Sequence, residues 1–499
     1  MNSKPNFLVI CVDQMQSYSL GINGNEQIKT PNLDELGKTG TSFNRAYCAN
    51  SVCMPSRASM FTGLTPKQHG LTVNGMKLNE DLPTIAGVLH KNGYRTYGAG
   101  KFHLQPTRPL VEVDSFERMD LWENGTYTKL PAMYYGFEDT FFVNGHGSGA
   151  GAEYANWLAE RGANTDMYQR AQACFDAGFK NNTWRMDIPD GLHYNEVIAD
   201  KTIDFMNNCA DNHENFFAWC SFPDPHAPFL STKPYCDMYD PNTIRLNATW
   251  QNTQDSVDHL IDRRKQLLKG TQNEAELREI VAQTYGMITH VDANVGRLVN
   301  ALKEKNILDN TVIIFIADHG EYLGSHGLLH KSDWQYEELV RVPFIWNVPN
   351  GKANGLSQDV VSALDLVPTI LDYANVSEEE FATRGINRAT CTVLPGRSLK
   401  NYLDNGDELQ PQPAYIEYDE DWFAGEFYRT RTIVTEKYKL THFINAGDGL
   451  MFDLENDLAE TNNLFFNEKF DKIKADLNEQ LLFHLIKTDR NDVPRHGAF

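Results

Sequence analysis

Four short apolar runs stand out along the chain, and each ends in a polar residue followed by a turn. The runs cover residues 7–12, 94–99, 216–220 and 312–317. Runs of this length that are apolar at nearly every position are typical of parallel strands buried on both faces of a sheet. The sequence therefore predicts a large sheet that is wholly or mostly parallel.

Segments with helical periodicity lie between these runs. They cover residues 33–39, 84–92, 194–207 and 277–303, and a last helix is expected over 364–373. Strands that alternate with helices are typical of an α/β fold in which helices cover both faces of the sheet. Because binding sites in such folds form beyond the carboxyl ends of the strands, we expect the chemistry of the chain at that edge.

The last part of the chain has a different pattern. Short strand-like segments at 414–418, 430–435, 439–443 and 449–454 precede a helical segment at 469–485. This order predicts a small antiparallel sheet packed against one helix. We therefore divide the chain into a large α/β domain over 1–375, a connecting segment over 376–412, and an antiparallel-sheet subdomain with a helix and a tail over 413–499.

Composition and charge exclude several classes of protein. The 499 residues carry a net charge of −22, so the basic surface that nucleic acids require is absent. No apolar run approaches the ~18 residues of a membrane span, and no signal peptide is visible. The eight cysteines include no C-x-x-C pair, which argues against a disulfide framework. We expect a cytoplasmic protein with neither nucleic acid nor membrane as a partner, or a periplasmic one if a signal was removed.

Charged and imidazole side chains follow all four apolar runs. In chain order they are Asp13, then Lys101 and His103, then His226, then Asp318 and His319. Carboxylates combined with one imidazole suit a divalent cation such as Ca²⁺, Mg²⁺ or Mn²⁺. Asp13, Asp318 and His319 are therefore candidate metal ligands.

A cysteine lies just ahead of a predicted helix. Residues 51–57 read Ser-Val-Cys-Met-Pro-Ser-Arg, and Thr62-Gly63 follow. Pro55 suits the first turn of a helix, where no amide donor is needed. We therefore expect Cys53 just outside a helix N-terminus, where the partial positive charge favours an oxyanion. Arg57 lies about one helical turn further on.

This stretch resembles the C-x-P-S-R…T-G signature of the type I sulfatases, a family of the alkaline phosphatase superfamily. The resemblance extends to Gly100-Lys101-Phe102-His103, to the segment that ends at His226, and to Lys331. Further matches run from the first strand to the C-terminal subdomain, so the resemblance covers nearly the whole chain. It implies an alkaline-phosphatase-like fold and a sulfuric ester hydrolase.

The resemblance also implies a modified residue and a metal. In that family the cysteine is oxidised after translation to formylglycine, so a formylglycine-generating or sulfatase-maturing enzyme would act on Cys53. One divalent cation is implied, and its ligands would be Asp13, Gln14, Cys53, Asp318 and His319. Gln14 departs from the family pattern, because many members have a second aspartate there. Ca²⁺ is the expected ion, with Mn²⁺ and Mg²⁺ as alternatives.

The resemblance implies roles for the remaining residues. One hydroxyl of the formylglycine hydrate attacks sulfur, while the metal and the cationic side chains neutralise the sulfuryl oxygens. His226, with Lys331, protonates the departing oxygen. His103 takes the proton of the second hydroxyl, and sulfate leaves as the aldehyde returns. The implied catalytic residues are Cys53, Arg57, Lys101, His103, His226 and Lys331.

Two other functions stay open at this point. Phosphonate monoester hydrolases or phosphodiesterases of the same superfamily resemble this chain in the Asp-Gln and Asp-His pairs of the metal ligands and in Asn74. They typically have uncharged polar residues where this chain has Lys101 and His103, whereas choline-sulfatase-like enzymes share both features. A non-catalytic sulfoglycan-binding protein is expected to have lost the nucleophile or the ligands, and this chain retains them.

The leaving group of the substrate is not specified by these motifs. A sulfated sugar, an aryl sulfate, and an alkyl or choline sulfate are all open. Asn74, His326 and Trp334 are predicted to contact the substrate, the last two because they lie close to Lys331 in the sequence. The tail 488–499 could reach a neighbouring subunit, so a homo-oligomer is open as well.

Overall fold

The computed structural model describes residues 4–163, 183–252, 274–378, 394–420, 428–443 and 447–489. Ten strands form its central sheet in the order β10-β2-β11-β9-β1-β7-β3-β4-β5, and β12 pairs with β2. The five strands at the centre of this order run parallel to one another. They are β9 (Thr311–Ala317), β1 (Asn6–Val12), β7 (Phe216–Phe222), β3 (Arg95–Gly100) and β4 (Asp139–Asn144). The predicted parallel core is therefore confirmed.

The flanking strands make the sheet mixed. β11 pairs antiparallel to both β9 and β2, β10 pairs antiparallel to β2, and β5 pairs antiparallel to β4, whereas β12 runs parallel to β2. Their bounds are β2 (Thr41–Tyr47), β5 (Gly151–Ala152), β10 (Arg341–Val342), β11 (Phe344–Asn347) and β12 (Gly355–Ser362). A separate two-stranded sheet joins β6 (Thr183–Met186) to β8 (Phe229–Thr232).

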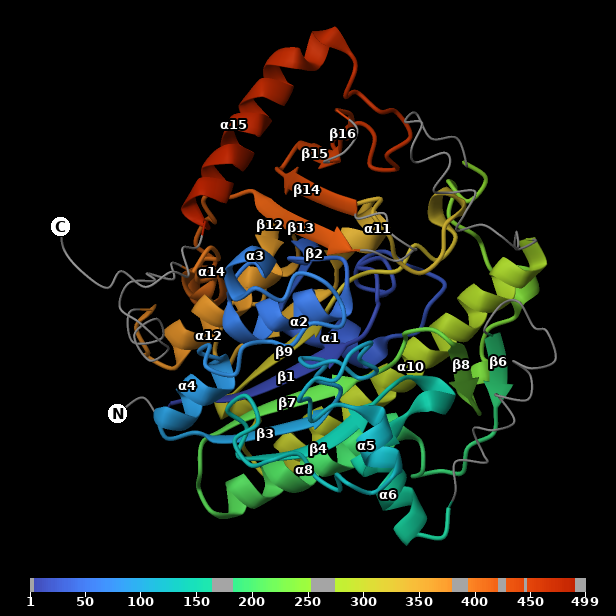
Figure 1. Cartoon of the computed structure of the whole chain (residues 1–499), viewed down its shortest axis with the longest axis vertical. Coiled ribbons are helices and arrows are strands. Elements are labelled where there is room, and N and C mark those ends of the chain that lie inside the picture. The colour runs from blue at the N-terminus through green and yellow to red at the C-terminus, as the bar shows by residue number, and fades with distance from the viewer. Residues whose placement is uncertain are drawn as a thin grey trace.

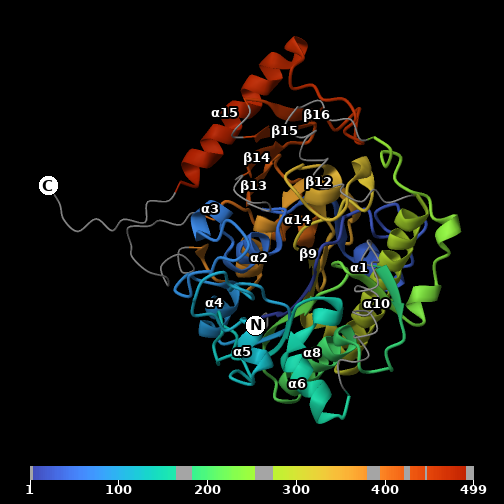
Figure 2. The ribbon, with the colours of Figure 1, turned by 45° about the vertical axis from the view of Figure 1, so that its right-hand side comes forward.

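Helices cover both faces of the central sheet (Figures 1 and 2). One face carries α1 (Pro31–Thr39), α8 (Tyr194–Asp211) and α10 (Glu274–Glu304), and the other carries α2 (Cys53–Thr62), α4 (Ile85–Lys91) and α12 (Leu366–Tyr373). Every residue of β1, β7 and β9 is buried between these layers, as the continuous apolar runs predict. The shorter helices are α3 (Pro66–His69), α5 (Met119–Glu123), α6 (Glu153–Glu160), α11 (Glu337–Val340) and α14 (Lys400–Asn405).

The C-terminal part forms the predicted antiparallel sheet and helix, at the top of Figure 1. Its strands pair in chain order: β13 (Ala414–Glu420), β14 (Tyr428–Val434), β15 (Tyr438–Phe443) and β16 (Gly449–Asp453). Helix α15 (Asp471–Lys487) lies against them through a small core of its own, which includes Ile433, Leu440, Met451, Leu477 and Leu481.

The division of the chain at residues 375 and 412 stays a prediction. Residues 379–393 of the predicted connecting segment and the tail from residue 490 lie outside the described residues. Within the described part, no helix combines the length and the apolar character that crossing a membrane would need.

Candidate active site

The carboxyl ends of neighbouring strands bring distant residues together. β1 and β9 pair in parallel up to Val12 and Ala317, so Asp13 and Asp318 leave the sheet side by side. β3 ends at Gly100, where φ is +98° and a Cβ atom would lie 1.8 Å from the carbonyl oxygen of Ser221, so only glycine fits. Lys101 follows, and it is buried together with both aspartates. The residues predicted from strand ends therefore meet at one edge of the sheet.

Cys53 is the first residue of α2, one position inside the helix rather than just outside it. Val52 is the N-cap, in an extended conformation. Its amide donates to Asn50 Oδ1 at 2.7 Å, and the amide of Met54 donates to Asn74 Oδ1 at 3.1 Å. Asn74, which we predict to contact the substrate, thus has its carbonyl oxygen engaged in holding the start of α2.

The Cys53 sulfur faces charged and titratable side chains from several segments. Its Sγ lies 2.8 Å from Lys331 Nζ, 3.2 Å from His319 Nε2 and 3.6 Å from Asp13 Oδ1. Burial and Asp13 oppose ionisation of the thiol, but Lys101, Lys331 and His319 outweigh them and hold its pKa well below the usual value. The side chains around residue 53 therefore stabilise a negatively charged atom at that position.

Arg57 lies one turn further along α2 and is completely buried. Its Nε donates to Asp318 Oδ2 at 2.7 Å, and its Nη1 donates to the carbonyl oxygen of Lys101 at 3.0 Å and to Ser221 Oγ at 2.9 Å. Burial lowers the pKa of the guanidinium, but Asp318 and Asp13 raise it by more, so the group stays charged. Arg57 thus ties α2 to the ends of the strands.

His319 presents a lone pair to the cluster. Its Nδ1 lies 2.8 Å from the carbonyl oxygen of Gly320. A carbonyl only accepts, so Nδ1 carries the proton and Nε2 is left as an acceptor. That Nε2 lies 3.9 Å from Asp13 Oδ1 and 3.8 Å from Asp318 Oδ1. In a metal-ligating histidine, the ring nitrogen that does not bind the metal usually donates a hydrogen bond that fixes the tautomer. Nδ1 of His319 makes this bond.

The side chains around Cys53 fit a divalent cation. One ligand atom from each of Asp13, Cys53, Asp318 and His319 lies within 4.8 Å of the others, and all four residues are buried. Gln14 supports the same interpretation: its Nε2 donates to Glu321 Oε2, while its buried Oε1 accepts no hydrogen bond from any described residue. Two carboxylates, an amide oxygen and an imidazole form a donor set suited to Ca²⁺, Mn²⁺ or Mg²⁺.

His146 belongs to the cluster, although the sequence interpretation missed it. Its Nε2 lies 2.6 Å from Lys101 Nζ and 3.3 Å from Asp13 Oδ2, and its ring stacks on that of His226 with centroids 3.7 Å apart. Lys101 also forms an ion pair with Asp13. His146 follows the apolar strand β4, so the rule of polar residues at strand ends could have found it.

Lys331 joins the cysteine to His226. Its Nζ lies 3.3 Å from His226 Nε2, besides its contacts with the Cys53 sulfur and with His319. His226 Nδ1 lies 2.5 Å from the carbonyl oxygen of Ala227, so Nδ1 is the protonated nitrogen and Nε2 is the acceptor. Cys53 and Asp13 hold the pKa of Lys331 above its usual value, although burial opposes this.

His103 approaches the cysteine from the segment after β3. Its backbone amide donates to Glu117 Oε2 at 3.1 Å, its φ is +58°, and its side chain forms a hydrogen bond with Cys53. Burial and the nearby Lys101 lower the pKa of His103 to about 4. The imidazole is therefore neutral near pH 7.

The other two residues predicted to contact substrate are buried. Trp334 is 0% exposed, and its carbonyl oxygen accepts the Tyr322 hydroxyl. The structure thus places Trp334 in the hydrophobic core. His326 is also buried, and its ring stacks on Tyr336 with centroids 3.8 Å apart.

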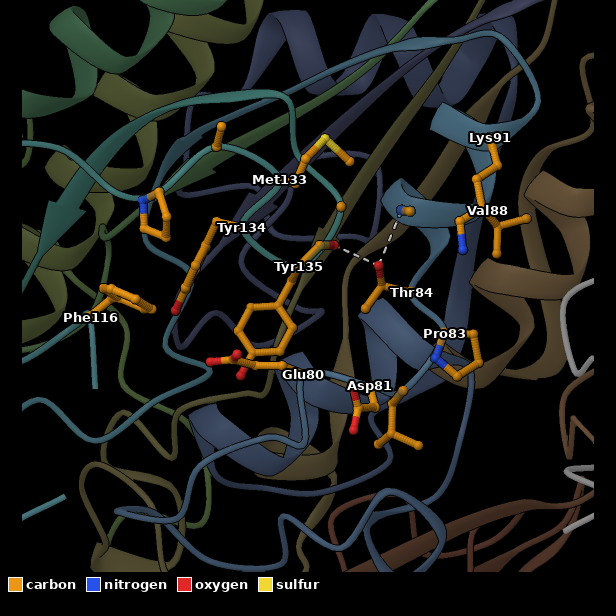
Figure 3. Close-up of a pocket in the computed structure, with 15 residues that line it drawn as sticks. Glu80, Asp81, Pro83, Thr84, Val88, Lys91, Phe116, Met133, Tyr134 and Tyr135 are labelled. Carbon is orange, nitrogen blue, oxygen red and sulfur yellow. Dashed lines mark hydrogen bonds between the residues drawn. The ribbon is translucent and has the colours of Figure 1, made fainter. Parts of the chain in front are cut away.

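A pocket of about 610 Å³ lies elsewhere, beside α4. Figure 3 shows Tyr134 and Tyr135 on one side of it and Thr84, Val88 and Lys91 on the other. None of the residues that line it belongs to the cluster around Cys53. The chemistry therefore concentrates at the strand ends and not in this pocket.

Comparison with known proteins assigns a family to this arrangement. The family model described as Sulfatase matches residues 5–376, and the model described as N-sulphoglucosamine sulphohydrolase, C-terminal, matches residues 324–487. The chain is 32% identical over 479 residues to an arylsulfatase of Clostridium perfringens, covering 94% of this chain and 91% of that protein. It is 26% identical to an N-acetylglucosamine-6-O-sulfatase of Bacteroides thetaiotaomicron, over 96% of this chain and 86% of that protein.

Solved structures share the fold. The phosphonate monoester hydrolase of Agrobacterium radiobacter superposes with a TM-score of 0.76 at 23% identity, over 97% of this chain and 96% of that chain. The chain belongs to the sulfatase family of the alkaline phosphatase superfamily, a class of sulfuric ester hydrolases. The resemblance drawn from the cysteine motif and the alkaline-phosphatase-like fold are both confirmed.

Proposed function

We propose that this sulfatase hydrolyses sulfate esters with residue 53 converted to formylglycine and with one divalent cation. The observation that carries the proposal is the set of cations around position 53. Arg57 and Lys101 pair there with the carboxylates of Asp13 and Asp318, and Lys331 adds a third positive charge beside Cys53. A buried site with surplus positive charge stabilises a transferring anionic group.

The metal and the modified residue would complete this site. Formylglycine formed from Cys53 supplies the nucleophile and the cation supplies Lewis acidity, and the residues that would hold the cation are Asp13, Gln14, Asp318 and His319. In the structure the Cys53 sulfur stands where a formylglycine oxygen would lie. Ca²⁺ is the ion that we propose, and metal analysis separates it from Mn²⁺ and Mg²⁺.

The chain's own residues can move the protons that ester cleavage requires. His226 Nε2 is an acceptor that faces Lys331 Nζ at 3.3 Å. The proton for the departing oxygen therefore comes from Lys331, directly or through His226. His103 is neutral and contacts residue 53, so it is placed to take a proton from that side chain. The proton donor Lys331 and the proton acceptor His103 therefore lie in different segments of the chain.

The leaving group we propose is an aryl or sugar alcohol. Relatives over most of the chain include the arylsulfatase and the N-acetylglucosamine-6-O-sulfatase named above. We further propose that a maturing enzyme oxidises Cys53 before the fold closes over it, because the residue is only 2% exposed. Homo-oligomer formation stays a prediction.

Paired initial rates test the proposal. One aryl sulfate and one aryl phosphonate monoester are compared, with residue 53 first identified as formylglycine by peptide mass. We expect a strong preference for the sulfate, because Lys101 and His103 are both charged or basic groups at the site. A preference for the phosphonate would contradict the proposal.

A phosphonate monoester hydrolase is the second candidate. Gln14 and His319 favour this function, because the Asp13-Gln14 and Asp318-His319 pairs resemble those of phosphonate monoester hydrolases. Both residues lie at the cysteine cluster. A non-catalytic sulfoglycan-binding protein would bind metal and turn over neither ester. The same pair of rates therefore distinguishes all three functions.

A further inference from the structure

Glu117, in the segment between β3 and α5, is a fully buried carboxylate with 0% exposure. Its Oε2 accepts the backbone amide of His103 at 3.1 Å, and its Oε1 accepts the backbone amide of Leu104 at 2.8 Å. The same Oε1 also accepts the Tyr134 hydroxyl at 2.7 Å. Both oxygens of Glu117 therefore hold the stretch of backbone that carries His103.

The groups around Glu117 need an acceptor on each oxygen. Burial raises the pKa of Glu117 to about 7, although the backbone amide of Leu104 and the Tyr134 hydroxyl oppose this. A carboxylate offers only acceptors, so it satisfies two amides and a hydroxyl together. A glutamine of the same shape, whichever way its amide is turned, places an NH₂ donor against the amide of His103 or of Leu104. The contact therefore depends on the carboxylate and not on the shape of the side chain.

His103 has a backbone conformation that needs support from its surroundings. Its φ of +58° lies in the left-handed region, which residues other than glycine rarely adopt. Such a conformation persists only where the surrounding structure holds it. The ring contacts Cys53, while its buried Nδ1 forms no hydrogen bond within the described part of the chain. The backbone that Glu117 holds therefore decides where the ring of His103 lies.

Glu117 is itself anchored on two sides. Its carbonyl oxygen accepts from Asn144 Nδ2, at the end of β4, at 2.7 Å. The amide of the preceding residue, Phe116, donates to Gln105 Oε1 at 2.7 Å. These bonds tie the segment of Glu117 to the central sheet and to the residues that follow His103. A side chain that supports a reacting group must be fixed in this way by its own neighbours.

We propose that Glu117 is the positioning residue that holds His103 in the left-handed conformation from which its ring reaches residue 53. The proposal rests on the proposed function, in which His103 takes a proton from residue 53, and it adds a residue to that site. The carboxylate of Glu117 bonds to the backbone and to Tyr134 rather than to Cys53, so it acts through His103.

A double-mutant cycle tests whether Glu117 acts through His103. An aryl sulfate is hydrolysed at pH 8 by the wild type, Glu117→Gln, His103→Ala and the double variant, each with residue 53 identified as formylglycine by peptide mass. Glu117→Gln should lower kcat by about 10- to 100-fold and leave KM within about two-fold, because a proton acceptor displaced by about 1 Å loses that much rate. The double variant should match His103→Ala within about two-fold, since the two residues act as one unit.

Asp292→Asn is the matched control. Asp292 is 1% exposed, and it accepts the backbone amides of Asn32 at 3.3 Å and of Leu33 at 2.8 Å, at the start of α1. This variant removes the same kind of contact away from His103, so it should lose thermal stability but keep kcat within about two-fold. Glu117→Asp, whose side chain is one methylene shorter and does not reach both amides, replaces Glu117→Gln in the cycle if that variant does not fold.

Crystal structures of the unmatured proteins, with Cys53 unmodified, supply a readout besides turnover. In the Glu117 variant, φ of His103 should leave the left-handed region and the ring should move away from the Cys53 sulfur. In Asp292→Asn, both should stay as in the wild type.

The proposal is overturned if the Glu117 variant keeps the wild-type kcat, if its loss multiplies with that of His103→Ala, or if its crystal structure shows His103 unmoved. Absence of turnover by the matured wild type would overturn the proposed function instead. The crystal structures would still decide whether Glu117 holds His103, so the two failures are distinguishable.

Discussion

Two clusters of buried charged side chains in the described part of the chain differ in how their charges are balanced. The cluster around Cys53 contains Arg57, Lys101 and Lys331 against two aspartates. The second, which we call the junction cluster, consists of Lys439, Glu337, Glu460 and Tyr47. It joins β15 to α11 and β2, at the contact of the C-terminal sheet with the large sheet.

The junction cluster neutralises its own charges. Lys439 Nζ lies 3.0 Å from Glu337 Oε1 and 2.6 Å from Glu460 Oε1, with all three side chains almost fully buried. Glu337 Oε2 accepts the Tyr47 hydroxyl at 3.0 Å, and Glu460 Oε2 accepts the amide of Glu337 at 2.6 Å. Burial and Glu337 raise the pKa of Glu460 to about 8, although Lys439 opposes this, so one carboxyl of the pair holds a proton.

The difference shows what distinguishes a binding cluster from a structural one. A buried charge without a counter-charge is costly, so a structural cluster adjusts protonation until it is balanced. The cysteine cluster keeps a positive surplus, which the anionic sulfate ester of the proposed function would balance. Surplus charge, and not the number of charged residues, identifies the site.

The largest expected effect comes from Cys53→Ala. Turnover of the aryl sulfate should fall at least about 10⁴-fold, because no other group replaces the nucleophile. The thermal unfolding temperature should stay close to that of the wild type. Cys209→Ala, at another buried cysteine, should retain activity. Substantial turnover in Cys53→Ala would refute the role of residue 53.

Asp13→Asn should remove the metal. We expect metal analysis to show about one ion per chain in the wild type and far less in the variant, since a carboxylate ligand to a hard cation is lost. The control is Asp365→Asn, at a buried carboxylate that accepts from the Ser362 amide at 2.9 Å, far from the cluster in sequence. Equal metal content in Asp13→Asn would argue against the ligand set.

Lys101→Met should lower kcat/KM for the sulfate ester by about 10²–10³-fold, because one preorganised positive charge is lost from the transition state. Lys38→Met, at an exposed lysine of α1, is the matched control and should leave the rate unchanged. The cluster's surplus charge would be irrelevant to catalysis if Lys101→Met retained the wild-type rate.

In the junction cluster, Lys439→Met should affect stability rather than chemistry. Removing the cation leaves Glu337 and Glu460 buried without the counter-charge of Lys439, which costs about 3–5 kcal/mol of unfolding free energy in urea. Lys437→Met, two residues away, removes only an exposed pair with Glu455 and should change stability by less than about 0.5 kcal/mol. Similar losses in the two variants would contradict the buried network.

The last prediction concerns the pH dependence of stability. The pKa of Glu460 is raised from 4.5 to about 8 on folding, so the folded state binds the proton more tightly. This contribution is complete below about pH 4.5 and is lost as pH rises through 8, with a slope of up to about 1.4 kcal/mol per pH unit. Glu460→Gln should flatten that part of the stability profile between pH 5 and 8, whereas Glu455→Gln should leave it as in the wild type. If the stability profiles of Glu460→Gln and the wild type run parallel between pH 5 and 8, Glu460 is not the source of this pH dependence.

Much of the fold follows from patterns that span only a few residues. The runs that become β1, β7 and β9 are apolar at almost every position because helices cover both faces, and this is visible in the chain itself. Asp13 and Asp318 were predictable as neighbours because parallel strands end at one edge.

Other parts of the site could not be predicted. Trp334 lies near Lys331 in sequence, yet its side chain is fully buried in the hydrophobic core. His146 could have been found from its place after strand β4, but the stacking of its ring on His226 is visible only in the structure. Side-chain direction is set by long-range packing, which local periodicity does not encode.

Sequence alone was sufficient for the fold class, the strand-end positions and the cysteine motif, because hydrophobic periodicity and motif spacing are properties of short segments. The tertiary structure decided the balance of charge around Cys53, the tautomers of His226 and His319, and the orientation of Gln14. Coulomb energies and hydrogen bonds depend on distances of a few ångströms between residues far apart in the chain, and only folding sets those distances.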